Sequence, residues 1–144
     1  MTTSTKENHA LTNCIGHLES MEEDFKAYIE AEKSNDYEKQ DEIRESIHNS
    51  ALSIQVRANE WQDSKNFFSD CESKDRVKPD QFNIQITWGG PALRVVGGLN
   101  QYQQPLKPSL QYQDWGTPWT AHDLTEDQEH ILNWWCSFFY FEVY

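Results

Sequence analysis

The spacing of apolar residues changes near residue 51, and this change constrains the fold more than any other feature of the 144-residue chain. Before it, apolar residues recur every three to four positions, which is typical of amphipathic helices. After it, they alternate with polar residues, which is typical of half-buried strands. The chain is therefore expected to be an α+β protein, with helices first and an antiparallel sheet after them.

Two helices are expected in residues 1–51. An apolar stripe predicts the first over about residues 8–33, and its members are Leu11, Cys14, Ile15, Leu18, Met21, Phe25, Tyr28 and Ile29. Asn35 and Glu38 have the spacing of a capping box, so the second helix is expected to begin near Asp36 or Tyr37. Because the break between them is short, the two helices should form an antiparallel hairpin.

Four strands are expected in residues 52–115. Alternation predicts two of them at 52–58 and 82–88, a third runs from Leu93 to Leu99, and a weaker fourth includes Leu110, Tyr112 and Trp115. Gly89-Gly90-Pro91 indicates a tight connection, and Gly97-Gly98 indicates a bend or bulge before a turn at Asn100. These short connections favour an antiparallel meander with one face covered by helices.

Residues 116–144 combine a Trp-rich turn with a last helix. The side chains of Trp115 and Trp119 are expected to pack on the body of the protein or on a partner. Thr125 and Gln128 have capping-box spacing, and the helix after them is apolar nearly all round. It is expected to lie between the sheet and the N-terminal hairpin, with a dimer face as the alternative. One domain is expected over residues 1–144, because a chain of this length buries one core.

No motif indicates catalysis, a cofactor or a metal. The chain has no GxGxxG, phosphate-binding loop, GxSxG or HExxH motif. Glu126 and His130 have the i, i+4 spacing of helical ligands, but a lone pair of this kind favours a surface contact over a metal site. Cys14, Cys71 and Cys136 form no CxxC pair and are expected to be reduced thiols. A non-enzymatic protein without a cofactor is therefore expected.

The chain is also expected to be cytoplasmic and without membrane contact. Its first residues lack the apolar core of a signal peptide, and no apolar run reaches the roughly eighteen residues of a membrane span.

The net charge of −12 is unevenly distributed. Residues 1–50 hold twelve acidic and five basic residues, residues 51–100 hold six of each, and residues 101–144 hold six and one. Such a surface repels nucleic acid and favours a protein partner with a basic surface. The nearest feature to a basic patch is formed by Arg57, Lys74, Arg76, Lys78 and Arg94. Since it lies in a part of the chain that is only neutral, direct nucleic-acid binding is not expected.

The acidic residues of the N-terminal hairpin are the main candidates for partner binding: Glu19, Glu22, Glu23, Asp24, Glu30, Glu38, Asp41, Glu42 and Glu45. A helix spaces carboxylates on a scale comparable with the phosphates of a nucleic acid, so this surface is suited to compete for a basic channel. Lysines and Arg44 are interleaved with the acids at pairing distances, which favours an ordinary solvated face as the alternative. A weaker candidate is Phe67, Phe68 and Asp70 in the long connection of residues 62–80.

Two strings of sequence carry a family resemblance. GGPALRVVG at residues 89–97 and YQDWGTPWT at residues 112–120, followed by the aromatic last helix, resemble small acidic proteins of phages and mobile elements, among them anti-CRISPR and other anti-defence inhibitors. The resemblance covers about residues 82–144. It implies a phage-encoded inhibitor in the cytoplasm of the bacterial host that binds a Cas effector, or another nucleic-acid-binding complex, and blocks it sterically or by acidic mimicry. It assigns no functional residue, because the shared strings are turns and core.

The alternative to an inhibitor is a phage structural or regulatory protein that acts as a homodimer. Its dimer face would be the last helix with the terminal residues 141–144. Both a monomer and a homodimer are thus compatible with the sequence.

Overall fold

The computed structural model describes residues 9–57, 79–88 and 91–141, which form an α+β protein as expected. The elements in chain order are α1 (His9–Lys33), α2 (Tyr37–Asn49), β1 (Ser53–Arg57), β2 (Gln81–Thr87), β3 (Ala92–Leu99), β4 (Pro105–Gln113), β5 (Thr120–Ala121) and α4 (Glu126–Cys136). The strands form one antiparallel sheet in the order β1-β2-β3-β4-β5, so each strand pairs with its neighbour in sequence. The predicted meander is confirmed.

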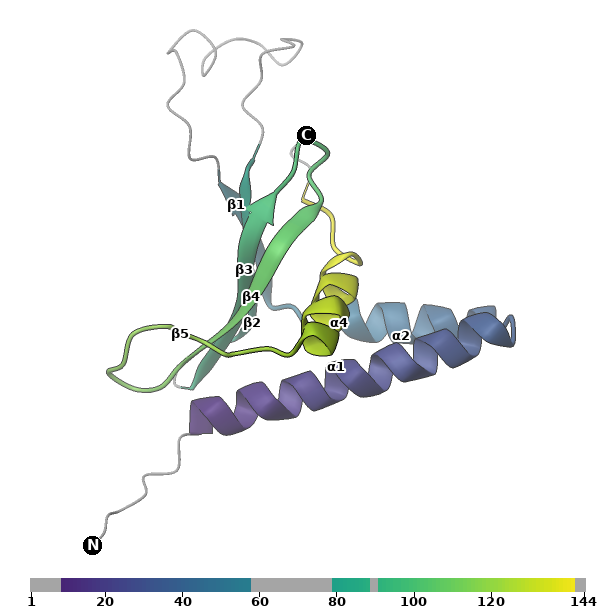
Figure 1. Ribbon diagram of the computed structural model, residues 1–144, viewed down its shortest axis with the longest axis horizontal. Coiled ribbons are helices and arrows are strands. Elements are labelled where there is room, and N and C mark those ends of the chain that lie inside the picture. Colours follow the sequence, from purple (N-terminus) through teal and green to yellow (C-terminus); the bar gives the residue numbers. More distant parts are fainter. Residues whose placement is uncertain (1–8, 58–78, 89–90, 142–144) are drawn as a thin grey trace, which may run out of the picture.

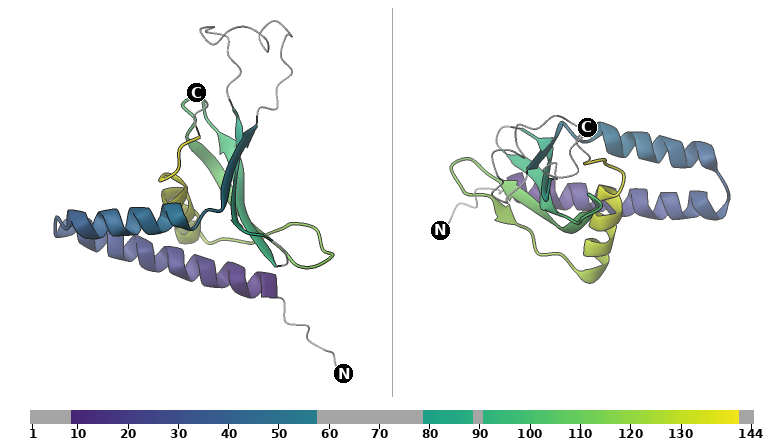
Figure 2. Two further views of the ribbon diagram at one scale, coloured as in Figure 1. Left: turned by 180° about the vertical axis from the view of Figure 1, so that it is seen from behind. Right: turned by 90° about the horizontal axis from the view of Figure 1, so that it is seen from above.

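The described helices α1, α2 and α4 lie on one side of the sheet (Figure 1). Helix α4 packs on the sheet, and α1 runs across the end of this layer beside α2. Seen from behind, no helix among the described residues covers the other face of the sheet (Figure 2). We call this uncovered face the outer face. Among the described residues, helices therefore cover one side of the sheet and leave the other side uncovered.

The turn between α1 and α2 differs from the prediction by one residue. Asp36, rather than Asn35, is the N-cap of α2, and its side chain accepts a hydrogen bond of 3.1 Å from the backbone N–H of Lys39. Asn35 instead has a φ of 55°. Asparagine tolerates this left-handed conformation better than most residues, so it forms the turn and leaves the cap to the next residue.

The second half of the sheet differs more from the prediction. Strand β4 begins at Pro105, earlier than expected, and the two-residue strand β5 was not predicted. Lys107 and Pro108 lie in a bulge opposite Gly97, where the register shifts, and Lys107 has a φ of 45°. Proline is tolerated at the first residue of a strand and at a bulge because neither position needs its missing N–H. Trp115, expected in the fourth strand, lies in the turn after β4.

Gly97 makes the bulge possible. A Cβ at this position would lie 2.9 Å from Cε1 of Phe82 and 3.0 Å from the carbonyl oxygen of Leu106. Phe82 in turn packs against Phe141 from the end of the chain, with ring centroids 4.6 Å apart. The expected bend or bulge at Gly97-Gly98 is thus confirmed, and it gives the ring of Phe82 its space beneath the backbone.

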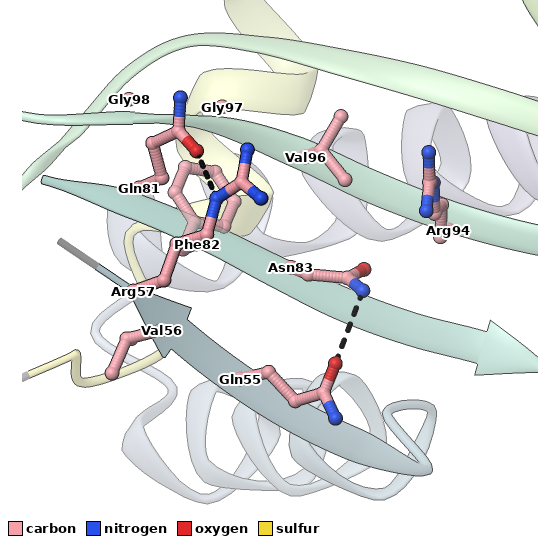
Figure 3. A pocket seen from close by; sticks show the side chains of 10 residues that line it. All are labelled: Gln55, Val56, Arg57, Gln81, Phe82, Asn83, Arg94, Val96, Gly97 and Gly98. Atoms are coloured by element: carbon pink, nitrogen blue, oxygen red, sulfur yellow. Dashed lines mark hydrogen bonds between the residues drawn. The ribbon is translucent and has the colours of Figure 1, made fainter. Parts of the chain in front are cut away.

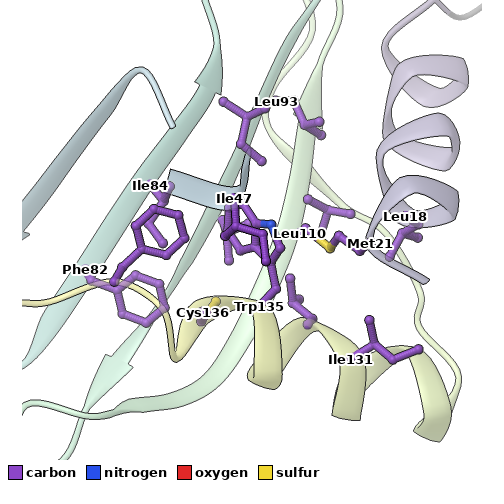
Figure 4. Packing of buried hydrophobic residues seen from close by; sticks show 14 of the residues in the cluster. Leu18, Met21, Ile47, Phe82, Ile84, Leu93, Leu110, Ile131, Trp135 and Cys136 are labelled. Atoms are coloured by element: carbon purple, nitrogen blue, oxygen red, sulfur yellow. The ribbon is translucent and has the colours of Figure 1, made fainter. Parts of the chain in front are cut away.

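The core lies between the sheet and α4 and α1 (Figure 4). Trp135 and Leu132 of α4 are buried against the inner face of the sheet, where Ile84, Val95 and Leu110 are fully buried. The position of α4 between the sheet and the hairpin is confirmed, because an element that is apolar nearly all round must be covered on several sides. Cys14 and Cys136 are buried free thiols, as expected of core residues.

Replacing Thr125 by alanine should lower the free energy of unfolding by about 1 kcal/mol. The hydroxyl of Thr125 accepts a 3.2 Å hydrogen bond from the backbone N–H of Gln128, whose side chain accepts a 3.0 Å bond from the backbone N–H of Thr125. The substitution removes one half of this predicted and confirmed capping box, because the backbone N–H of Gln128 loses its side-chain acceptor. Urea denaturation measures the effect. Gln128→Glu, which keeps a side-chain acceptor, is the control, and an equal loss in both variants would exclude the capping explanation.

Candidate functional site

The α1–α2 hairpin extends beyond the sheet as an arm (Figures 1 and 2). Its turn, residues 34–36, lies far from the sheet both in the front view and in the view from above. There the two helices contact each other: Ala31 is buried between them, and the side-chain amide of Gln40 donates a 3.3 Å hydrogen bond to the carbonyl oxygen of Ala31. The far half of this arm therefore presents most of its circumference to solvent.

Charge is segregated between the helices and the sheet. The three described helices contain thirteen acidic and four basic residues, whereas the five described strands contain three basic residues and no acidic one. Acidic residues are thus concentrated on the helical side, and the arm carries most of them. Such an arrangement makes the potential around the arm negative and attractive to a basic surface.

Seven of the nine predicted acidic residues are exposed on the arm: Glu19, Glu23, Glu30, Glu38, Asp41, Glu42 and Glu45. The three on α1 recur at spacings of four and seven residues, so they share the face opposite the buried stripe. Those at 38, 42 and 45 share a face of α2 for the same reason. The structure therefore brings most of the predicted set to the surface of one projecting element.

Two of these exposed acids form ion pairs within α2. A carboxylate oxygen of Asp41 lies 2.6 Å from Nη1 of Arg44, and a carboxylate oxygen of Glu42 lies 3.7 Å from Nζ of Lys39. Exposed pairs of this kind contribute little to stability and are readily exchanged for others. They match the solvated face that was the alternative prediction. Within the described residues the other five exposed acids form no ion pair, and they are Glu19, Glu23, Glu30, Glu38 and Glu45.

The remaining two predicted residues are half-buried. Glu22 accepts a 3.4 Å hydrogen bond from the side-chain amide of Gln128, which links α1 to α4. Burial raises the pKa of Asp24 above its usual value, the neighbouring Glu23 raises it further, and Lys39 acts in the opposite direction. These two carboxylates are thus positioned for contacts inside the protein more than for a partner.

The second predicted contact site lies outside the described residues. It consists of Phe67, Phe68 and Asp70, and the same applies to most of the 62–80 connection that contains them. Its role as a binding segment stays a prediction.

The potentially reactive side chains are dispersed. Burial raises the pKa of Cys14 to about 11 and that of Cys136 further, so both thiols stay protonated near neutral pH. His17 is half-buried, with its ring edge-on to Trp135 at a centroid distance of 5.6 Å, and burial lowers its pKa to about 4. His130 of the predicted surface pair lies edge-on to the ring of Phe25. No three His, Cys, Asp or Glu side chains of the described ranges are placed to hold a metal ion.

Sequence reasoning missed a hollow on the outer face of the sheet (Figure 3). It measures about 790 Å³ and is lined by Gln55, Val56, Arg57, Gln81, Phe82, Asn83, Arg94, Val96, Gly97 and Gly98. The sequence alone groups Arg57 and Arg94 with three lysines and arginines of the middle segment, because strand register is needed to show that these two share a face. The absence of acidic residues from the expected strands at 52–58, 82–88 and 93–99 was the available signal.

The described helices include none that is both long and apolar enough to span a membrane.

No family model matches the chain, and no curated protein or solved structure is significantly similar to it. The resemblance of residues 82–144 to anti-CRISPR proteins therefore stays a prediction. The geometry and charge of the arm are therefore the basis for a proposed function.

Proposed function

We propose that the protein is a non-enzymatic inhibitor that uses the acidic arm to bind a basic surface of a nucleic-acid-binding complex. The observation that carries this proposal is the exposure of five carboxylates on one hairpin, none of which forms an ion pair among the described residues. The resemblance to phage proteins gives the target class, a CRISPR effector of the bacterial host. The arm then occupies the channel that the effector uses for guide or target nucleic acid.

Electrostatics favours this mode of inhibition. Carboxylates on adjacent turns of a helix are about 6 Å apart along the axis, which allows several basic side chains of a channel to pair with them at once. Long-range attraction between opposite charges speeds association, and salt weakens it because the Debye length is about 8 Å at physiological ionic strength. Inhibition by the arm is therefore expected to weaken as the salt concentration rises.

Reversing three unpaired acids should disrupt inhibition. In the triple variant Glu23→Lys, Glu30→Lys and Glu38→Lys, like charges meet in the complex, so affinity for the effector is expected to fall by at least about tenfold. All three side chains are exposed, so the fold should be kept. The measurements are complex formation with purified CRISPR effector complexes on a sizing column and inhibition of their binding to target DNA.

The matched control has the same change of net charge on another element. Asp123→Lys, Glu126→Lys and Glu129→Lys change exposed acids just before and at the start of α4, outside the α1–α2 hairpin. This control should keep the affinity within about threefold. If both triple variants lose the same affinity for the effector, the arm is not the binding surface. Absence of a complex, together with unchanged target-DNA binding, would remove the proposed target class.

Part of the surface expected to form the homodimer interface is buried within one protomer. Phe139 and Phe141 are buried, as are Trp135 and Cys136 of α4, so these side chains already pack within one protomer. Tyr140 is exposed. Light scattering at micromolar concentration distinguishes the two functions, since the inhibitor proposal expects a monomer that binds the effector and the alternative expects a dimer that does not.

A further inference from the structure

The hollow on the outer face of the sheet has a chemistry opposite to that of the arm. Among the described residues that line it, none is acidic, two are arginines, and three are the amides Gln55, Gln81 and Asn83. It belongs to a different face from the arm, since the helices cover the other side of the sheet (Figures 2 and 3). A volume of about 790 Å³ is in the range of pockets that hold small organic ligands, and it is much larger than a single ion needs.

Arg94 is held in place without a charged partner among the described residues. Its Nε donates a 2.9 Å hydrogen bond to Oε1 of Gln111, and its guanidinium lies over the ring of Trp119 at 4.0 Å from the centroid. Burial lowers its pKa, although an arginine stays protonated at neutral pH. No carboxylate of the described residues pairs with it. Its two terminal nitrogens are left to donate together, the arrangement with which arginine binds an oxyanion.

Arg57 is a second cation of the same kind at the other end of the hollow (Figure 3). Its Nε donates to Oε1 of Gln81, and it also has no acidic partner among the described residues. Arg57 pairs in register with Gln81 and Arg94 with Gln85. Since these two glutamines are four residues apart on β2, the arginines are separated by about 13 Å along the strands. They are placed to bind two anionic groups more readily than one.

The polar side chains between the arginines indicate the chemistry of the part of the ligand that connects its two anionic groups. The amide nitrogen of Asn83 donates to Oε1 of Gln55 at 3.4 Å, and Oδ1 of Asn83 has no hydrogen-bond partner in the described residues. An unpaired acceptor of this kind is stabilised by a ligand with an N–H or O–H group. Amide side chains with paired donors and acceptors are also suited to the edges of nucleobases.

We infer that this hollow binds a short phosphodiester of dinucleotide size, with one phosphoryl group on Arg94, a second on Arg57, and a base against the amides of Gln55 and Asn83. The net charge of −12 repels a long polyanion, so the site selects short ligands. This inference does not depend on the proposed function of the arm.

The test is titration of the full chain with a 5′-phosphorylated dinucleotide, measured by calorimetry and by tryptophan fluorescence. Arg57→Gln and Arg94→Gln should each weaken binding by about tenfold or more, because each removes a charge-assisted contact. Trp119→Phe should remove most of the fluorescence change, since that ring lies against Arg94. Lys107→Gln is the control: it removes the third strand cation, which does not line the hollow, and should keep affinity within about twofold.

Other probes decide the ligand class. Adenosine monophosphate should bind about fivefold or more weakly than the dinucleotide, because it offers one phosphoryl group, and equal binding would overturn the two-anion arrangement. Citrate that binds as tightly as the dinucleotide would overturn the choice of phosphate over carboxylate. A 20-nucleotide strand that binds more tightly would overturn the preference for short ligands. No binding of any probe, or unchanged binding by both arginine variants, would overturn the site itself. Arg57 is exposed, so its variant keeps the test valid if Arg94→Gln fails to fold.

Discussion

Replacing Trp135 by alanine is expected to lower the free energy of unfolding by about 3–5 kcal/mol, the largest effect of any single substitution considered. Trp135 is 1% exposed and lies where α4, α1 and the sheet meet (Figure 4). Its ring contacts Phe139 at a centroid distance of 4.9 Å and lies edge-on to His17. Truncation leaves a cavity between three elements that the backbone of α4 cannot collapse to fill.

Denaturation in urea, followed by far-UV circular dichroism, measures this loss. Trp115→Ala is the matched control, since Trp115 is 78% exposed and should contribute less than about 0.5 kcal/mol. If the two variants lose similar stability, α4 is not anchored on the sheet by Trp135. The position assigned to α4 in the core would then be wrong.

Stability is expected to fall by up to about 3 kcal/mol between pH 6.5 and pH 4 because of His17 alone. Burial lowers the pKa of this histidine from 6.5 to about 4 in the folded protein, and Nε2 has no hydrogen-bond partner in the described residues. In this window the unfolded chain binds a proton that the folded protein does not. The stabilisation is therefore fully present above pH 6.5 and is lost as the pH falls to 4.

The contribution of His17 is isolated by comparison with His17→Gln. Carboxylates titrate in both proteins, so they cancel in the difference between the two curves of unfolding free energy against pH. That difference should change by about 3 kcal/mol across the window. A flat difference for His17→Gln would mean that water reaches this ring in the folded state.

The elements with strong periodicity were predictable from the sequence. The stripe at residues 11–29 gave α1 within a residue at its start, and the spacing of Thr125 and Gln128 gave the cap of α4. These signals are local, because a helix satisfies its own backbone and needs only a cap and one apolar face. The exposure of the acidic residues on the arm followed from the same stripe.

Features that depend on pairing between strands were not predictable. Pro105 and Pro108 argue against a strand when the sequence is read alone, yet both lie in β4 because its start and its bulge need no N–H from them. The two residues of β5 are too few to show a period. The common face of Arg57 and Arg94 appears only from the register of β1, β2 and β3.

The prolines of β4 have one more consequence. Strand β5 pairs only with Gln111 and Tyr112, so the first part of β4 forms an open border of the sheet within the described residues. Borders of this kind recruit strands from other molecules and start aggregation. Pro105, Pro108 and the charged Lys107 occupy this stretch, and each of them opposes such addition. The two prolines that make β4 hard to predict from the sequence thus also oppose edge-to-edge pairing between protein molecules.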